Sequence, residues 1–281
     1  MEKREHKEAA KLIKAADALI FSSGAGMGVD SGLPDFRGDE GFWKAYPPIR
    51  KLGYSFIDMA NPQWFESDPQ LAWAFYGHRF NMYRNTAPHR GFDYLLEMGK
   101  AAPHGYFAYT SNVDGHFQQA GFDTNRVVEV HGSIHHFQCL KGCSEHIYDA
   151  PDHDIPLDEE TFKAEHPLPV CPNCGGLARP NILMFGDWGW ISTRSREQQQ
   201  RLDNFLRQFS NENIVVIEAG AGSALPTVRR FSEQISKLFD TPMIRINPRD
   251  PEINRSYQGS FSFSGGAEES LRMIYKEYRK L

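Results

Sequence analysis

The chain has 281 residues, of which 40% are hydrophobic and 24% are charged, and its formal net charge at pH 7 is −5. This composition is typical of a globular protein of one large domain, or of one such domain with a small satellite. Without a basic run, the chain is not expected to bind nucleic acid, and it contains no apolar run of the roughly 18 residues that a membrane span needs. Its charged N-terminus lacks the features of a signal peptide, so we expect a cytoplasmic protein with no membrane partner.

Helix and strand patterns alternate along the chain. Apolar residues recur with a helical period over residues 5–17, and the short apolar run 18–21 predicts a buried strand. Four further strands are predicted at residues 107–110, 127–130, 214–218 and 243–246. Further helices are predicted at residues 92–99, 196–209 and 267–278. This alternation predicts an α/β fold, with a Rossmann-like doubly wound parallel sheet.

Two segments interrupt the alternation. Residues 39–90 are rich in aromatic side chains and predict an insertion of helices and loops. Residues 136–180 are rich in Pro, Asp and His and predict a small module without a large core of its own. The remaining residues, 1–38, 91–135 and 181–281, are predicted to form the Rossmann-like domain.

A glycine-rich loop, residues 22–38, follows the first predicted strand. Such a turn lets the backbone and its N–H groups approach the phosphates of a dinucleotide. The dehydrogenase fingerprint needs Gly or Ala where this chain has Val29, which disfavours an ordinary hydride-transfer enzyme. A tight turn without a ligand remains the alternative for the first glycines alone. The continuation is more specific, because an acid, an aromatic and a base form a plausible lid at Asp35, Phe36 and Arg37.

The four cysteines of the chain fall in two close pairs, Cys139 with Cys143 and Cys171 with Cys174. Four thiolates in this arrangement predict a closed tetrahedral zinc site, which is structural because no position is left for water. Two disulfides or free thiols are the alternatives. One zinc ion would supply much of the folding energy of a zinc-ribbon-like module with so little core. The acidic spacer 144–170 is expected to be an exposed insertion.

Residues 24–38 resemble the GAGIS-x-x-SGIPDFRG motif of the sirtuins, the Sir2-type NAD-dependent protein deacylases. The notable departure is Gly28, where the family usually has serine. Further resemblances follow in the family's order over almost the whole chain, at residues 110–114, 128–133, 179–187 and 220–223.

The resemblance implies that NAD is the co-substrate and lies between the sheet and the loop 32–38. The implied cofactor-binding residues are Gly24, Ala25, Gly26, Asp35, Phe36, Arg37, Ser111, Asn112, Asp114, Gly220, Gly222, Ser223, Asn247 and Ala267. Ser111 replaces a family glutamine that contacts the ribose, and residues 221–222 depart from the family's Gly-Thr-Ser.

The resemblance also implies the catalytic residues. His131 would be the general base, a role that suits the unperturbed pKa of histidine near 6.5. Asn112 would orient the ribose or a water molecule, and Asp114 would hold the amide of nicotinamide. Read without the family, a lone histidine is more often structural, and Ser-Asn-x-Asp after a strand is more often a turn.

Two further pairs of residues resemble substrate-binding positions. Sirtuins that prefer succinyl, malonyl or glutaryl lysine carry Tyr-x-x-Arg in a helix, and this chain has Tyr76 and Arg79 in the insertion, which would form the cofactor and acyl pocket. Residues three apart share a helix face, so the two side chains could bind a carboxylate. The alternative is a solvated arginine beside a core tyrosine. Phe185 and Gly186 lie in the segment that pairs with an acyl-lysine peptide in the family, or that simply returns from the zinc module.

The function that the resemblance implies is removal of acyl groups from protein lysine, either acetyl or a longer acidic group such as succinyl or malonyl. Its products would be lysine, nicotinamide and O-acyl-ADP-ribose, and its partners acylated proteins. Transfer of ADP-ribose to a protein, or hydrolysis of NAD, would use the same site and remains an alternative. A non-catalytic NAD-binding sensor is a second alternative. The sequence predicts neither the protein target nor the oligomeric state.

Overall fold

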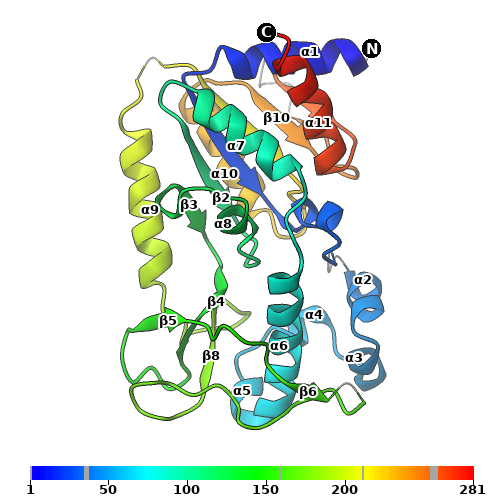
Figure 1. Cartoon of the computed structure of the whole chain (residues 1–281), viewed down its shortest axis with the longest axis vertical. Coiled ribbons are helices and arrows are strands. Elements are labelled where there is room, and N and C mark those ends of the chain that lie inside the picture. Colours follow the sequence, from blue (N-terminus) through cyan, green and yellow to red (C-terminus); the bar gives the residue numbers. More distant parts are fainter. Residues whose placement is uncertain (1, 35–37, 159, 211, 254–258) are drawn as a thin grey trace.

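The structure is a computed structural model that describes residues 2–34, 38–158, 160–210, 212–253 and 259–281. Figure 1 shows a parallel sheet with its helices near the two termini, and a small antiparallel sheet with further helices at the opposite end. Among the described residues, no helix combines the length and the apolar character that crossing a membrane requires.

The larger sheet has six parallel strands in the order β11-β10-β9-β1-β2-β3. The strands are β1 (Ala18–Ser23), β2 (Tyr106–Thr110), β3 (Val127–Glu129), β9 (Ile214–Ala219), β10 (Met243–Ile246) and β11 (Phe261–Phe263). Every residue of the first five is buried, because helices cover both faces of a parallel sheet. The predicted doubly wound α/β fold is therefore confirmed, with β11 as a sixth strand that the prediction missed.

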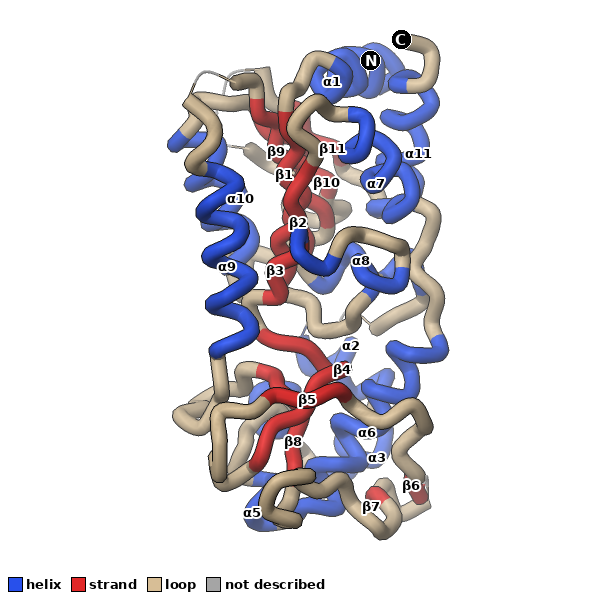
Figure 2. The backbone as a smooth tube through the Cα atoms, turned by 60° about the vertical axis from the view of Figure 1, so that its left-hand side comes forward, coloured by secondary structure: helices blue, strands red, loops and turns tan. Residues whose placement is uncertain are grey.

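Helices pack on both faces of this sheet (Figures 1 and 2). One face is covered by α1 (Glu2–Lys14), α7 (Gly91–Ala101) and α11 (Ala267–Tyr278), which share a core with it. The other face is covered by α9 (Thr193–Leu206) and α10 (Thr227–Leu238). The sequence pattern did not predict α10, because its buried face includes Ser232 and Ser236 between apolar positions.

The aromatic insertion folds into helices, as predicted. They are α2 (Gly38–Ala45), α3 (Pro47–Leu52), α4 (Phe56–Met59), α5 (Trp64–Ser67) and α6 (Pro69–Asn85). The longest, α6, begins after Asp68, whose carboxylate accepts a hydrogen bond from the N–H of Leu71 at 3.1 Å. Trp73, Phe75 and Tyr76 of α6 are buried in an aromatic core that this segment shares with the small antiparallel sheet.

The cysteine segment forms the small sheet, with strands in the order β5-β4-β8. Its strands are β4 (Gly132–Cys139), β5 (Ile147–Asp149) and β8 (Ala178–Ile182), and a hairpin of β6 (Leu157–Asp158) and β7 (Lys163–Ala164) lies apart from them. Strand β4 crosses the predicted domain boundary at residue 136, and the division into three units stays a prediction.

The spacer 144–170 is not the exposed insertion that its acidic composition suggested. Ile155, Phe162, Ala164 and Leu168 are buried against the aromatic core. The backbone of Ile155 forms two hydrogen bonds, both 2.9 Å long, with the side chain of Asn81 on α6. These buried apolar residues and the two hydrogen bonds dock the spacer on α6, so the spacer clamps this helix.

Candidate active site

Several of the predicted site residues, among the part of the chain that the structure describes, lie at the carboxyl ends of β1, β2, β3 and β9. The chain runs outward from β1 to β2 and β3 on one side, and then returns to β9, β10 and β11 on the other. The strand order therefore reverses beside β1, and open α/β sheets bind ligands in the crevice at such a switch point. The loops that follow β1 and β9 lie at this point and contain Gly24, Gly26 and Gly220.

These two glycine loops contact each other through their backbones. The N–H of Gly24 donates to the carbonyl of Ala219 at 3.1 Å, and that of Gly26 donates to Gly220 at 3.0 Å. A Cβ atom on Gly26 would lie 2.8 Å from the Cα of Gly220, so a side chain would force the loops apart. The glycines thus hold the two loops together, while Ala25 is exposed between them. The N–H groups of Gly24 and Gly26 are therefore already used, and a phosphate would have to accept hydrogen bonds from other N–H groups.

Replacing Gly220 by alanine is expected to destabilise the protein by roughly 3 kcal/mol or more. Its φ is +64°, and a Cβ there would lie 2.1 Å from the backbone nitrogen of Met27. Gly53→Ala is the matched control, because Gly53 has a similar φ of +76° but no atom within 4 Å of the added Cβ. In Gly53→Ala, the strain of the positive φ alone should lower the free energy of unfolding by about 1 kcal/mol. Urea unfolding measures both values, and equal losses would contradict the close packing of the loops.

Residues after β2 are tied to the first glycine loop. The Asn112 side chain donates to the carbonyl of Gly24 at 3.0 Å, and its N–H donates to the hydroxyl of Thr110 at the same distance. The Ser23 hydroxyl donates to Thr110 at 2.9 Å, and the N–H of Ser111 donates to the carbonyl of Ser23 at 3.2 Å. The predicted residues Ser111 and Asn112 are therefore held beside the loop that begins at Gly24.

Asp114 is buried next to Gly28. Its carboxylate accepts a hydrogen bond from the N–H of His116 at 2.9 Å. Burial raises the pKa of Asp114, and the neighbouring His116 offsets part of this rise. A Cβ on Gly28 would lie 3.7 Å from the carboxylate and 3.1 Å from Leu33, so this glycine leaves room beside Asp114 where the family usually has serine.

His131 lies between β3 and β4, where the chain passes from one sheet to the other. Burial lowers the pKa of His131 below 6.5, and a hydrogen bond to the backbone of Ser111 offsets part of this. The carbonyl of His131 accepts a bond of 2.9 Å from the N–H of Leu183, which follows β8. At neutral pH His131 is thus mainly unprotonated, as a general base must be.

The segment after β8 is held in place from both sides. The N–H of Phe185 donates to the carbonyl of Ala60 at 2.9 Å, while Gly186 has a φ of +68° and open space around it. The buried ion pair of Arg179 and Asp187 spans the segment, and Asp187 also accepts from the N–H of Met184 at 3.2 Å. Sequence reasoning missed this ion pair, although two opposite charges flanking an apolar run were its signal.

Asn247 and its neighbours fix the second glycine loop. The buried side chain of Asn247 donates to the carbonyl of Ala221 at 2.7 Å and accepts from the N–H groups of Arg249 and Asp250. Because both ends of its amide are engaged, Asn247 positions the loop that contains Gly222 and Ser223. The hydroxyl of Ser223 donates to the carboxylate of Asp250 at 3.2 Å.

The first residue of α11, Ala267, is buried and lies near the first glycine loop. The N–H of the next residue, Glu268, donates to the carboxylate of Asp30 at 2.8 Å. The three predicted lid residues, Asp35, Phe36 and Arg37, lie outside the described residues.

Arg79 is buried on α6 and is not the solvated arginine of the alternative interpretation. Its guanidinium donates to the hydroxyl of Tyr83 at 3.0 and 3.2 Å and lies 5.3 to 5.9 Å from four aromatic rings, those of Phe56, Phe75, Tyr76 and Tyr83. Burial alone would lower the pKa of Arg79, but the neighbouring tyrosines raise it, so the side chain stays charged. Burial also raises the pKa of Tyr76 to about 12, so its hydroxyl remains a donor. Tyr83 was missed at the sequence level, although it lies four residues from Arg79.

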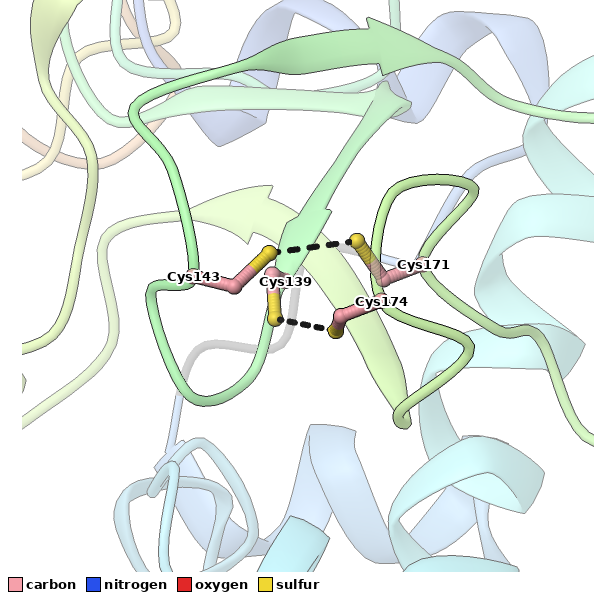
Figure 3. Close-up of side chains that lie close together, drawn as sticks. All are labelled: Cys139, Cys143, Cys171 and Cys174. Atoms are coloured by element: carbon pink, nitrogen blue, oxygen red, sulfur yellow. Dashed lines mark hydrogen bonds between the residues drawn. The ribbon is translucent and has the colours of Figure 1, made fainter.

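The four cysteines converge from two turns, as Figure 3 shows. Their sulfur atoms all lie within 4.8 Å of one another. The Sγ atoms of Cys139 and Cys174 are 3.7 Å apart, and those of Cys143 and Cys171 are 3.6 Å apart. Disulfide sulfurs are about 2.05 Å apart, whereas Zn–S bonds of about 2.3 Å set sulfur separations near 3.8 Å in a tetrahedron. The donor set therefore fits one structural zinc ion and contradicts two disulfides.

Comparison with known proteins agrees with this geometry. The family model described as "Sir2 family" matches residues 24–207. The chain is 29% identical to an NAD-dependent protein deacylase of Pyrococcus abyssi, over 98% of each chain, and 27% identical to one of Aquifex aeolicus, over 93% of this chain and 95% of that protein. A solved Sir2 homolog–NAD complex is similar with a TM-score of 0.71 and 27% identity, over 96% of this chain and 93% of the other.

Proposed function

The chain belongs to the Sir2 family, and on that premise we propose that it removes acyl groups from protein lysine side chains in an NAD-dependent reaction. The observation that carries the proposal is the convergence of Asn112, Asp114 and His131 on the glycine loops at the switch point of the sheet. Its relatives' names as NAD-dependent protein deacylases support the same reaction.

In the proposed reaction, NAD is consumed as a substrate. The acyl oxygen of the modified lysine attacks the ribose carbon that bears nicotinamide, and the bond to nicotinamide breaks. His131 accepts the proton of a ribose hydroxyl, and the resulting oxygen attacks the acyl carbon. Addition of water then releases lysine and leaves the acyl group on ADP-ribose. Asn112, fixed by its bond to Gly24, orients the ribose or the water, and Asp114 holds the nicotinamide amide.

The four cysteines would hold zinc, and none of them is among the residues assigned to the reaction. The ion would have all four positions taken by thiolates, so it stabilises the small sheet and takes no part in bond making.

The distribution of products tests the proposal. Incubation with NAD and an acyl-lysine peptide should give equal amounts of nicotinamide, free lysine and O-acyl-ADP-ribose, measured by mass spectrometry. Nicotinamide without O-acyl-ADP-ribose would instead support ADP-ribosyl transfer or NAD hydrolysis. Ser111 favours this second candidate, because it stands where the family has a glutamine that contacts the ribose. No NAD turnover would leave a binding sensor.

We propose further that Tyr76 and Arg79 select an acyl group that ends in a carboxylate. A buried, charged guanidinium among aromatic rings gains more from an added carboxylate than an exposed arginine does, because little water competes for it. The hydroxyl of Tyr83, which already accepts from Arg79, orients the guanidinium.

Arg79→Met is expected to lower kcat/KM for a succinyl-lysine peptide roughly 10-fold or more, and to change the value for an acetyl-lysine peptide only a few-fold. Hydrogen bonds to a charged group contribute about 1.5–3 kcal/mol, and the acetyl group makes none here. Arg84→Met on the same helix is the control, since Arg84 bonds the spacer at Asp152. Steady-state kinetics on the two peptides measure the ratio. An equal loss on both would show that Arg79 supports the helix rather than the substrate.

The expected cytoplasmic location stays a prediction.

A further inference from the structure

A second cleft, of about 640 Å³, lies beside the edge strand of the parallel sheet. It is bounded by β3, α9, the short helix α8 (His116–Gln119) and β4 of the small sheet. Figure 2 shows these four elements near the middle of the molecule. None of the residues predicted to bind NAD or the acyl peptide lines it. Its volume is in the range that small-molecule sites occupy.

The charged side chains of the cleft are mostly positive. Arg84, Arg194 and Arg201 line it together with a single carboxylate, that of Glu129. Arg194 forms an ion pair with Glu129, which neutralises one of the three arginines. Arg84 donates to the backbone carbonyl of Asp152 at 2.6 Å and so keeps its charge at the cleft. The cleft therefore carries an excess of positive charge.

Several buried polar atoms of this lining have no partner. In the part of the chain that the structure describes, these are Glu129 Oε1, His136 Nδ1, Arg194 Nη1 and Arg201 Nε. The side chain of Arg201 forms no hydrogen bond or ion pair with any described residue. Buried polar groups are nearly always satisfied by protein, water or ligand, so several unsatisfied atoms around one cleft point to a polar occupant.

The two arginines with free donors are placed on one face of one helix. Arg194, Gln198 and Arg201 follow the spacing i, i+4, i+7 along α9, so all three line the cleft. Gln198 is already engaged, because its side chain accepts from the N–H of Glu129 at 3.0 Å. It holds α9 to β3 and leaves the arginines on either side to meet a ligand.

We propose that this cleft is a second ligand site, which binds a small anionic metabolite through a phosphate or carboxylate group held by Arg201 and Arg194. A planar guanidinium suits both groups, because it donates two parallel hydrogen bonds. The unpartnered Oε1 of Glu129 and Nδ1 of His136 belong to residues of the same lining. Glu129 lies two residues before His131, so the site adjoins the strand that leads to the predicted base. The inference does not depend on the proposed reaction.

Isothermal titration calorimetry with inorganic phosphate and, separately, citrate tests the site. We expect saturable binding of one ligand per chain for at least one probe, and the tighter probe identifies the anionic group. Arg201→Met should weaken this binding 10-fold or more. Arg196→Met is the matched control, because Arg196 is exposed on the same helix and does not line the cleft; it should change the affinity less than twofold.

A third variant covers the case in which Arg201→Met does not fold. Arg201→Lys keeps the charge but loses the planar donor pair, so it should bind the probe more weakly than the wild type. Failure of both probes to bind saturably would overturn the proposal. Binding that survives Arg201 substitution unchanged, or that falls equally with Arg196→Met, would also overturn it.

Discussion

Replacing His131 by alanine is expected to lower kcat/KM for deacylation by at least about 100-fold, the low end of what general bases contribute. The affinity for NAD should change little, because the loops that hold Gly24 and Gly220 are bonded to each other and not to the imidazole. In the proposed order of steps, His131 acts after nicotinamide has left. The variant should therefore still exchange free labelled nicotinamide into NAD in the presence of an acyl peptide.

The control is His153→Ala, which removes an exposed histidine of the spacer. It should keep the wild-type rate. The pH profile gives a further check, because burial lowers the pKa of His131 below 6.5. As the unprotonated form is the active base, kcat/KM should fall only as the pH drops through that lowered pKa, on the acid side of 6.5. A fall centred above 6.5, or an alanine variant with wild-type turnover, would remove His131 from the mechanism.

Loss of the metal is the second large effect that we expect. Purified protein should contain one zinc ion per chain, and Cys171→Ser should contain almost none, as measured by plasma mass spectrometry. The small sheet is connected to the parallel sheet through β4. Zinc binding contributes about 10–16 kcal/mol to the folding of small zinc modules. The variant should therefore show an open, protease-sensitive cysteine segment and a lower midpoint of thermal unfolding.

Loss of zinc should also lower the deacylase activity, although zinc makes no contact with the reacting atoms in the proposal. The Phe185 segment follows β8 of the small sheet, and Leu183 is bonded to His131. Ser144→Ala is the control, since Ser144 directly follows the cysteine at position 143 but offers no thiolate. Its zinc content and its unfolding midpoint should match the wild type. A Cys171→Ser protein that keeps one zinc ion and its stability would contradict the four-cysteine site.

The parts of the fold that the sequence predicted are those with a strong local pattern. Strands such as β1 and β9 are apolar at almost every position because both faces of the sheet are covered, and such runs are readable without the structure. Strand β11 has only three residues, of which one is buried, so it leaves no comparable pattern. Helix α10 was missed because Ser232 takes a buried position and bonds the hydroxyl of Ser22 at 2.7 Å, a contact across 210 residues.

The candidate site follows the same rule. Gly24, Asn112, His131 and the cysteines lie in short contiguous motifs, and each was identified from its own segment. What the sequence could not give are pairings between distant segments. The hydrogen bond from the side chain of Asn247 to the carbonyl of Ala221 is one example. The cleft around Arg201, which several segments line together, is another feature of this kind. Such pairings depend on how the loops pack, which no single segment encodes.

The clamp on α6 has a consequence for how this protein can change over evolutionary time. Zinc would close a loop of roughly 27 residues between Cys143 and Cys171, and the entropy of closing a loop grows by only about 0.6 kcal/mol for each doubling of its length. Insertions and deletions in that loop are therefore inexpensive as long as Ile155 still bonds Asn81. The length of this loop can therefore vary, while the few residues that contact α6 must stay the same. Because Tyr76 and Arg79 lie on α6, the same contacts also constrain their positions.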